Sequence, residues 1–134
     1  MSYKLYAIRV FSTHWDRALE FYRDVVGFKL VYEDKGLGWA QFDLGSTYLG
    51  LERCDPSDPE TKTLVGRFVG ASIEVEEIET TYKQLIKKGV QFVAPPEKQI
   101  WGGTLAHFKD PDENILTLLG QPDMSVGHNF TPET

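Results

Sequence analysis

The sequence contains little cysteine and no long hydrophobic run. Cys54 is the only cysteine among the 134 residues, so no disulfide can form within one chain. The apolar runs are a few residues long, far short of what a membrane-crossing helix needs. No basic and then apolar leader opens the chain, so we expect no export signal. These absences predict a protein of the reducing cytoplasm that makes no contact with membranes.

Basic residues are also few. Lysine and arginine number 14 against 20 aspartate and glutamate residues, which gives a formal charge of −6. The basic residues are not clustered, and a negatively charged protein repels the phosphate backbone of nucleic acids. The chain has no glycine-rich phosphate loop, no Cys-x-x-Cys pair and no serine-elbow motif. We therefore expect no nucleic-acid partner and none of these common cofactor or nucleophile motifs.

One pattern of elements occurs twice in the chain. At 134 residues, with 41% apolar and 25% charged residues, the chain fits one domain. Within residues 5–54, a strand precedes apolar residues spaced three and four apart, which is typical of an amphipathic helix. Ser12 or Thr13 is expected to cap this helix, and Gly27 to end it. The helical stripe is Trp15, Ala18, Leu19, Tyr22, Val25 and Val26, and the strands are expected at residues 6–11, 28–32, 39–44 and 48–52.

The same order returns after a polar, proline-rich connector over residues 55–66. In residues 67–120 we expect a helix that ends at Gly89, with strands at residues 69–75, 91–94, 104–109 and 114–119. The two copies are offset by 63 residues along the first strand and helix, which indicates an internal duplication. We therefore predict one α+β domain over residues 1–134. It consists of two β-α-β-β-β modules whose curved sheets enclose a cup, with helices outside and a tail over residues 121–134.

Strand alternation predicts which side chains face the cup. In the first strand Ile8 and Val10 lie on one side, toward the helix, while Arg9 and Phe11 lie on the other. The side away from the helices is polar and aromatic in every module, so it needs either water or a ligand. The expected ligand-binding residues are Arg9, Phe11, Trp39, Gln41, Tyr48, Glu52, Ser72, Trp101, His107 and Thr117, with Glu74 on the same face.

Two segments of the chain carry a family resemblance. Residues 16–28 and residues 101–114 resemble the vicinal oxygen chelate superfamily, which includes glyoxalase I, extradiol dioxygenases and the bleomycin and fosfomycin resistance proteins. The likeness runs in order from Tyr6 to Gly120 through both modules. It implies a paired β-α-β-β-β fold, a homodimer, and a small-molecule site enclosed by curved sheets.

The resemblance also implies where a metal ion would bind. The usual ligand positions fall on Ala7, Gly70 and Thr117, and near Gly50, with Glu52 two residues further on the same face. A protein-bound divalent cation needs three or four donors, and at most one strong donor is present here. We therefore predict no metal and no other cofactor, which disfavours glyoxalase I and dioxygenase chemistry.

A turn over residues 110–114 departs from the family in one place. Relatives commonly have glycine where this chain has Glu113. If this residue must adopt a positive φ, glutamate costs about 1 kcal/mol relative to glycine, and we expect the turn to form nevertheless.

Arg9 and His107 each allow two interpretations. An unpaired guanidinium in a dry cup is costly, so Arg9 needs an anion, either Glu52 or Glu74 or a carboxylate or phosphate of a ligand. His107 lies where extradiol dioxygenases carry a tyrosine that faces the site. It either exchanges a proton or hydrogen bond with a ligand or is satisfied by a neighbouring group. His14 and His128 are expected to be exposed or in the tail, and poor ligands.

The aromatic and acidic residues are ambiguous in the same way. Trp39, Trp101, Tyr48 and Phe11 either form a stacking wall for a planar ligand or fill the core. Glu52 and Glu74 either act as a base or are simply solvated or paired.

Three hypotheses follow for the function. The first is metal-independent binding of a small molecule in the cup, of which drug sequestration is one form. The second is a lactoylglutathione-lyase-like or isomerase enzyme that uses Glu52, Glu74 and His107 as acid-base groups. The third is a dimeric module without a ligand.

Overall fold

The first module of the computed structural model has the predicted order of elements. The structure describes residues 1–122. Helix α1 is followed directly by a turn of π-helix, η1, so the helical segment is continuous. The elements are β1 (Ala7–Ser12), α1 (Trp15–Glu20), η1 (Phe21–Val26), β2 (Lys29–Asp34), β3 (Trp39–Asp43) and β4 (Tyr48–Arg53).

The second module repeats this order with two additions. A short helix lies in the connector and a two-residue strand precedes β8, and neither was predicted. Both are too short to give a periodic pattern. The elements are α2 (Thr61–Leu64), β5 (Phe68–Val75), α3 (Ile78–Lys87), β6 (Gln91–Phe92), β7 (Glu97–Lys98), β8 (Thr104–Lys109) and β9 (Ile115–Gly120).

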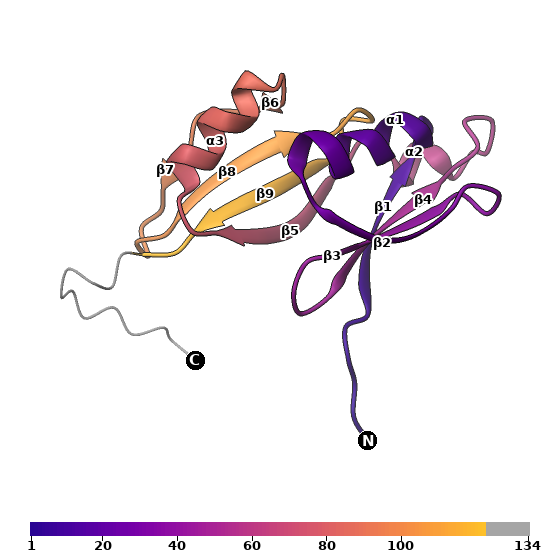
Figure 1. Cartoon of the computed structure of the whole chain (residues 1–134), viewed down its shortest axis with the longest axis horizontal. Coiled ribbons are helices and arrows are strands. Elements are labelled where there is room, and N and C mark those ends of the chain that lie inside the picture. Colours follow the sequence, from indigo (N-terminus) through magenta and orange to yellow (C-terminus); the bar gives the residue numbers. More distant parts are fainter. Residues whose placement is uncertain (123–134) are drawn as a thin grey trace.

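Each module forms its own sheet. The strand order is β1-β4-β3-β2 in the first sheet and β5-β9-β8-β6 in the second, where β7 also pairs with β8. The first strand of each module is parallel to its last strand, and the other pairs are antiparallel. The sheets lie beside each other with α1 and α3 on the same side (Figure 1). The α+β class and the two β-α-β-β-β modules are confirmed. No helix in residues 1–122 has both the length and the apolar character to cross a membrane.

The hydrophobic core runs through both modules without a break. Part of it is a chain of aromatic contacts between the first helical segment and the second sheet. Tyr22 stacks on Phe28 with ring centroids 5.8 Å apart, and Phe21 lies 6.3 Å from Phe108. Phe108 in turn lies 5.9 Å from Phe92. Because the core is shared, the two sheets are held together by packing as well as by the connector.

The predicted helix ends are right, but the predicted cap is wrong. Gly27 and Gly89 follow the two helices with φ of 87° and 90°. The residue that precedes α1 is His14, and it makes no side-chain capping hydrogen bond. Ser12 and Thr13 lie before this residue, and both hydroxyl groups donate to Asp112. Ser12 Oγ also accepts a hydrogen bond from the His14 backbone N–H at 3.0 Å, which lies before the first turn of the helix.

Glu113 has a φ of 65°, as the family comparison of the turn suggested. Every other residue in the described part of the chain with a positive φ is a glycine. We predict that Glu113→Gly raises the free energy of unfolding by up to about 1 kcal/mol. Glycine has no Cβ atom, so the steric strain of the left-handed conformation is relieved.

Urea unfolding measures this change. Glu113→Ala is the matched control, since it also removes the exposed carboxylate that lies 3.7 Å from Lys109 but keeps the Cβ atom. An equal gain in both variants would contradict the explanation by backbone strain.

Candidate ligand site

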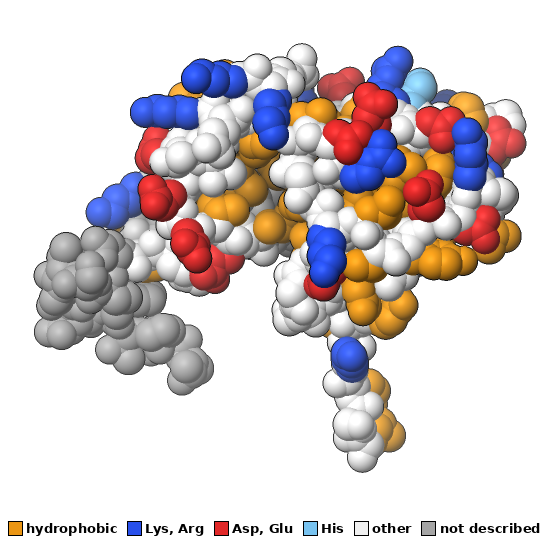
Figure 2. All heavy atoms as spheres, viewed as in Figure 1, with side chains coloured by type: hydrophobic (Ala, Val, Ile, Leu, Met, Phe, Trp, Pro, Cys, Tyr) orange, Lys and Arg blue, Asp and Glu red, His pale blue; other side chains and the backbone are white. Residues whose placement is uncertain are grey.

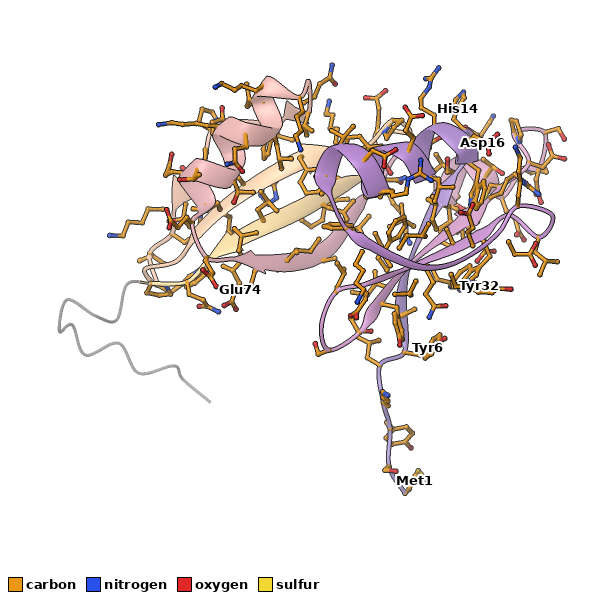
Figure 3. All side chains as sticks on the ribbon, viewed as in Figure 1. Met1, Tyr6, His14, Asp16, Tyr32 and Glu74 are labelled. Carbon is orange, nitrogen blue, oxygen red and sulfur yellow. The ribbon has the colours of Figure 1, made fainter. Side chains whose placement is uncertain are left out.

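The strand register of the first sheet places its predicted site residues on one face. Residues directly opposite each other on neighbouring strands point to the same side of a sheet. Three such rows cross β1, β4 and β3 on the side away from α1. They are Phe11–Glu52–Trp39, Arg9–Gly50–Gln41 and Ala7–Tyr48–Asp43. In Figure 3, Tyr6 and Tyr32 lie below this sheet, on the side opposite α1. We call Arg9, Phe11, Trp39, Gln41 and Glu52 the first-sheet group.

Trp39 lies across the sheet over Gly50. A Cβ atom at position 50 would come within 2.2 Å of the indole ring, so the ring occupies the space of a side chain there. The indole Nε1 donates to Gln41 Oε1 at 3.2 Å, and Gln41 Nε2 donates to the Tyr6 hydroxyl at 3.0 Å. The indole is therefore held in a fixed orientation on the open face.

Phe11 lies on the same face but is only 6% exposed. Two guanidinium groups cover it. The Cζ atom of Arg9 is 5.3 Å from the ring centroid, and that of Arg67 is 5.8 Å from it. Arg9 also pairs with Glu52 at 3.1 Å, with the two side chains 58% and 38% exposed. The structure therefore contains the internal ion pair that was one of the two alternatives for Arg9.

Arg67 is a residue that the sequence analysis missed. It precedes β5, and a register shift lies between Phe68 and Ser72. Strand alternation cannot assign a face to a residue beyond such an irregularity. Gly70, within the shift, has a φ of 75°. The one feature of the sequence that could have indicated Arg67 as a site residue is its position just before a predicted strand.

The second sheet has a separate set of site residues. One row across β5, β9 and β8 is Ser72–Thr117–His107. His107 Nδ1 lies 2.8 Å from the hydroxyl oxygen of Thr117, and the imidazole ring packs edge-on against Phe68 at 5.5 Å. His107 thus has the neighbouring partner that was one of its two interpretations. We call Ser72, Glu74, His107 and Thr117 the second-sheet group.

Trp101 lies in the loop before β8. A Cβ atom at Gly103 would come within 1.9 Å of its ring, so this indole packs on its own loop. Trp101 is 39% exposed. None of the aromatic contacts among residues 1–122 joins it to Trp39, Tyr48 or Phe11.

A cavity of about 310 Å³ lies between the two modules. Figure 2 shows hydrophobic side chains gathered where the modules meet. The cavity reaches Ser72 and Glu74 but none of the first-sheet group, and its other lining residues are Ile8, Leu44, Ser46, Thr47, Leu49, Ala71 and Ile73. Tyr48 borders a smaller cavity of about 80 Å³ next to Tyr6. Arg67 of the second module places a charged side chain against the Phe11 ring of the first-sheet group.

Each of the predicted acid-base residues has a different hydrogen-bond or ion-pair partner. Glu52 binds Arg9, and Glu74 accepts a hydrogen bond from Gln121 Nε2 at 3.1 Å. His107 contacts Thr117. No hydrogen bond within residues 1–122 joins any two of Glu52, Glu74 and His107, so these contacts do not assemble them into a catalytic set.

The positions that would bind a metal in the family do not supply a suitable donor set. Trp39 fills the space above Gly50, and Gly70 has a backbone conformation that disfavours any side chain. Ala7 offers no donor atom, and the Thr117 hydroxyl is already bonded to His107. No group of three or more histidine, cysteine, aspartate or glutamate residues in the described chain is arranged to hold a metal ion. A divalent cation needs more donors than these positions offer.

Asn114 fixes the position of Phe11 relative to the second module. Its side chain is almost fully buried. Its Nδ2 atom donates to the Phe11 carbonyl oxygen and to Asp110 Oδ2, each at 2.9 Å. Its Oδ1 atom accepts from the Gly66 backbone N–H at 2.8 Å. A single side chain therefore joins β1, the connector and the turn before β9.

Two buried aspartates of the same turn complete this contact. Asp110 accepts a hydrogen bond from the Tyr22 hydroxyl at 2.7 Å, and burial raises the pKa of both groups. Burial also opposes ionisation of Asp112, but hydrogen bonds from Ser12 and from Thr13 outweigh it and lower the pKa of Asp112. His14 Nδ1 lies 3.2 Å from the same carboxylate. Asp112 is thus held as an anion against the first module. The predicted residue His128 lies outside the described residues.

A family model and several known proteins match the sequence of this chain. The model described as Glyoxalase/Bleomycin resistance protein/Dioxygenase superfamily matches residues 4–118. Uncharacterized protein YraH of Bacillus subtilis is 29% identical over 123 residues, covering 86% of this chain and 96% of that protein. A bleomycin resistance protein of Klebsiella pneumoniae is 27% identical over 115 residues, covering 81% of this chain and 85% of that protein.

The fold also matches solved structures. The crystal structure of TnmS3, an antibiotic binding protein from Streptomyces sp. CB03234, has a TM-score of 0.71 and 27% sequence identity. The match covers 92% of this chain and 98% of that chain.

We predict that Asp112→Asn lowers the free energy of unfolding by about 1–3 kcal/mol near pH 7, because the buried donors lose a charged acceptor. The folded pKa of Asp112 is lowered. Its contribution is therefore complete above the ordinary pKa of about 4 and is lost as the pH falls through the folded pKa. The difference between wild type and variant should shrink in acid.

Urea unfolding at neutral and acid pH measures this difference. Asp16→Asn is the control, since Asp16 is 70% exposed and lies 3.6 Å from Lys35 on the surface. A difference that stays constant across the acid range would contradict the assigned role of the Asp112 carboxylate.

Proposed function

Because the chain belongs to the Glyoxalase/Bleomycin resistance protein/Dioxygenase superfamily, we propose that it binds a planar aromatic small molecule on the first-sheet group without a metal ion. The single observation that carries the proposal is the fixed indole of Trp39 over Gly50. The family resemblance implies a metal-ligand position near Gly50. An aromatic surface thus takes the place of a metal donor at this position.

The contacts around Trp39 favour binding over mere packing. The indole is half-buried, and it is oriented by a hydrogen bond to Gln41. A side chain that is already ordered loses little conformational entropy when a ligand stacks on it. Phe11 and Arg9 lie on the same face, so apolar and polar contacts are available together, as in most small-molecule sites.

Two relatives support a drug-like ligand. The Klebsiella pneumoniae protein is named a bleomycin resistance protein, and the Streptomyces protein is described as antibiotic binding. We propose that this chain likewise binds a molecule of this kind, and that it sequesters the molecule rather than converting it.

A ligand panel tests this function. Saturating ligand should stabilise the protein by about 2.7 kcal/mol at a concentration 100 times Kd. We predict that at least one planar aromatic compound in a panel that includes bleomycin raises Tm, equally with and without EDTA. Trp39→Ala should weaken binding about tenfold or more, because the stacking surface is lost.

Three further variants sharpen the test. Gly50→Ala should weaken binding too, because the new Cβ atom displaces the indole. Trp101→Ala removes an indole of equal size outside the first-sheet group and should have a smaller effect. Arg23→Ala, which breaks an exposed pair with Asp24, should have none. Silence across the whole panel, or binding that EDTA abolishes, would contradict the proposal.

We also propose that the functional form is a homodimer. No hydrogen bond within residues 1–122 joins the second-sheet group to the first-sheet group, so a second copy would help to enclose the ligand. Exposed aromatic side chains near the open faces, such as Phe68 at 59% and Tyr6 at 58%, are consistent with such a contact. Light scattering should give about twice the chain mass of 15.2 kDa, and a monomer at micromolar concentration would contradict the proposal.

A further inference from the structure

Two positive charges lie over one ring at the edge of the first-sheet group. Arg9 and Arg67 come from different modules, yet each guanidinium lies within 6 Å of the Phe11 ring centroid. Each guanidinium thus places a positive charge next to the same ring, and guanidinium groups are common partners of carboxylates and other anions.

Only one of the two charges has a carboxylate partner within residues 1–122. Arg9 pairs with Glu52, while Arg67 makes no ion pair with any described residue. The cluster therefore has a local excess of positive charge on a protein whose formal charge is −6. An anion that binds here gains from Arg67 directly and can share Arg9 with Glu52.

The backbone around the cluster is fixed before any ligand arrives. Asn114 binds the Phe11 carbonyl oxygen through Nδ2 and the Gly66 N–H through Oδ1. The Arg67 carbonyl oxygen accepts a hydrogen bond from the Ile115 N–H at 2.9 Å. Phe11 and Arg67 are thus tied to the same short segment, which keeps their relative position constant and lowers the cost of binding.

The cluster also lies at a suitable distance from the stacking surface. Phe11 and Trp39 are the two ends of one row, with Glu52 between them. Adjacent strands are about 4.8 Å apart, so the two backbones are separated by about 10 Å. A molecule of two fused rings with an acidic group at one end has about this length.

We propose that Arg9 and Arg67 together bind the carboxylate of an aromatic acid whose rings stack on Trp39. This inference rests on the proposed function and adds the chemical class of the ligand. Arg67 is its distinguishing element, because this residue reaches the first-sheet group from the second module.

Calorimetry on the full chain with matched probes tests the inference. The probes are 2-naphthoate and its neutral counterpart 2-naphthylmethanol. We expect the acid to bind about tenfold or more tightly than the alcohol, because a guanidinium contact with a carboxylate is charge-assisted. The advantage should fall as the salt concentration rises.

Variants of Arg67 separate charge from packing. Arg67→Met keeps a long side chain over Phe11 but removes the charge, so it should abolish the preference for the acid and leave binding of the alcohol unchanged. Arg67→Lys should retain part of the preference. Arg23→Ala removes one positive charge from an exposed pair elsewhere and is the control. An unchanged Tm in Arg67→Met verifies that the fold is intact.

The outcomes distinguish this inference from the proposed function. If acid and alcohol bind equally, or if Arg67→Met leaves the preference intact, the inference is overturned and aromatic binding stands. If neither probe binds and the wider panel is silent too, both are overturned.

Discussion

The buried turn over residues 110–114 is the contact on which the rest of the structure depends. Asn114 and the two aspartates of this turn bind backbone and side-chain groups of the first module, and the bonds to the Phe11 carbonyl, the Tyr22 hydroxyl and the Ser12 hydroxyl are buried. Buried polar groups are costly when their partners are missing, so the network tolerates only one arrangement of the modules. The shared hydrophobic core, aliphatic and aromatic, provides the bulk of the burial, and the turn helps to align the two sheets.

This alignment determines which residues can act together. The face covered by α1 is packed, while the opposite face carries the first-sheet group. Because Asn114 holds both Phe11 and the segment before Arg67, a charge from the second module reaches the open face of the first. The proposed ligand site is therefore a consequence of how the modules join, and neither module contains all of it.

In the proposed site, one position distinguishes aromatic stacking from metal coordination. Glycine at position 50 allows the indole of Trp39 to lie directly on the sheet. A carboxylate there would both offer a donor and exclude the ring. Aromatic stacking, as proposed, and metal coordination would thus compete for the same space, and the side chains at positions 7 and 70 offer no donors that would favour metal coordination.

The sequence by itself determined the two modules, both helix ends and the positive φ of Glu113, because periodicity, glycine and turn chemistry act over a few residues. It also gave the faces of β1, β3 and β4, since alternation needs only an unbroken strand. Helix α2, strand β7 and the pairing of Ser12 and Thr13 with Asp112 were missed. The two partners of that pairing lie about a hundred residues apart in the chain. Only the tertiary structure placed Arg67 against Phe11 and Trp39 over Gly50, because such contacts depend on register and on how separate modules pack.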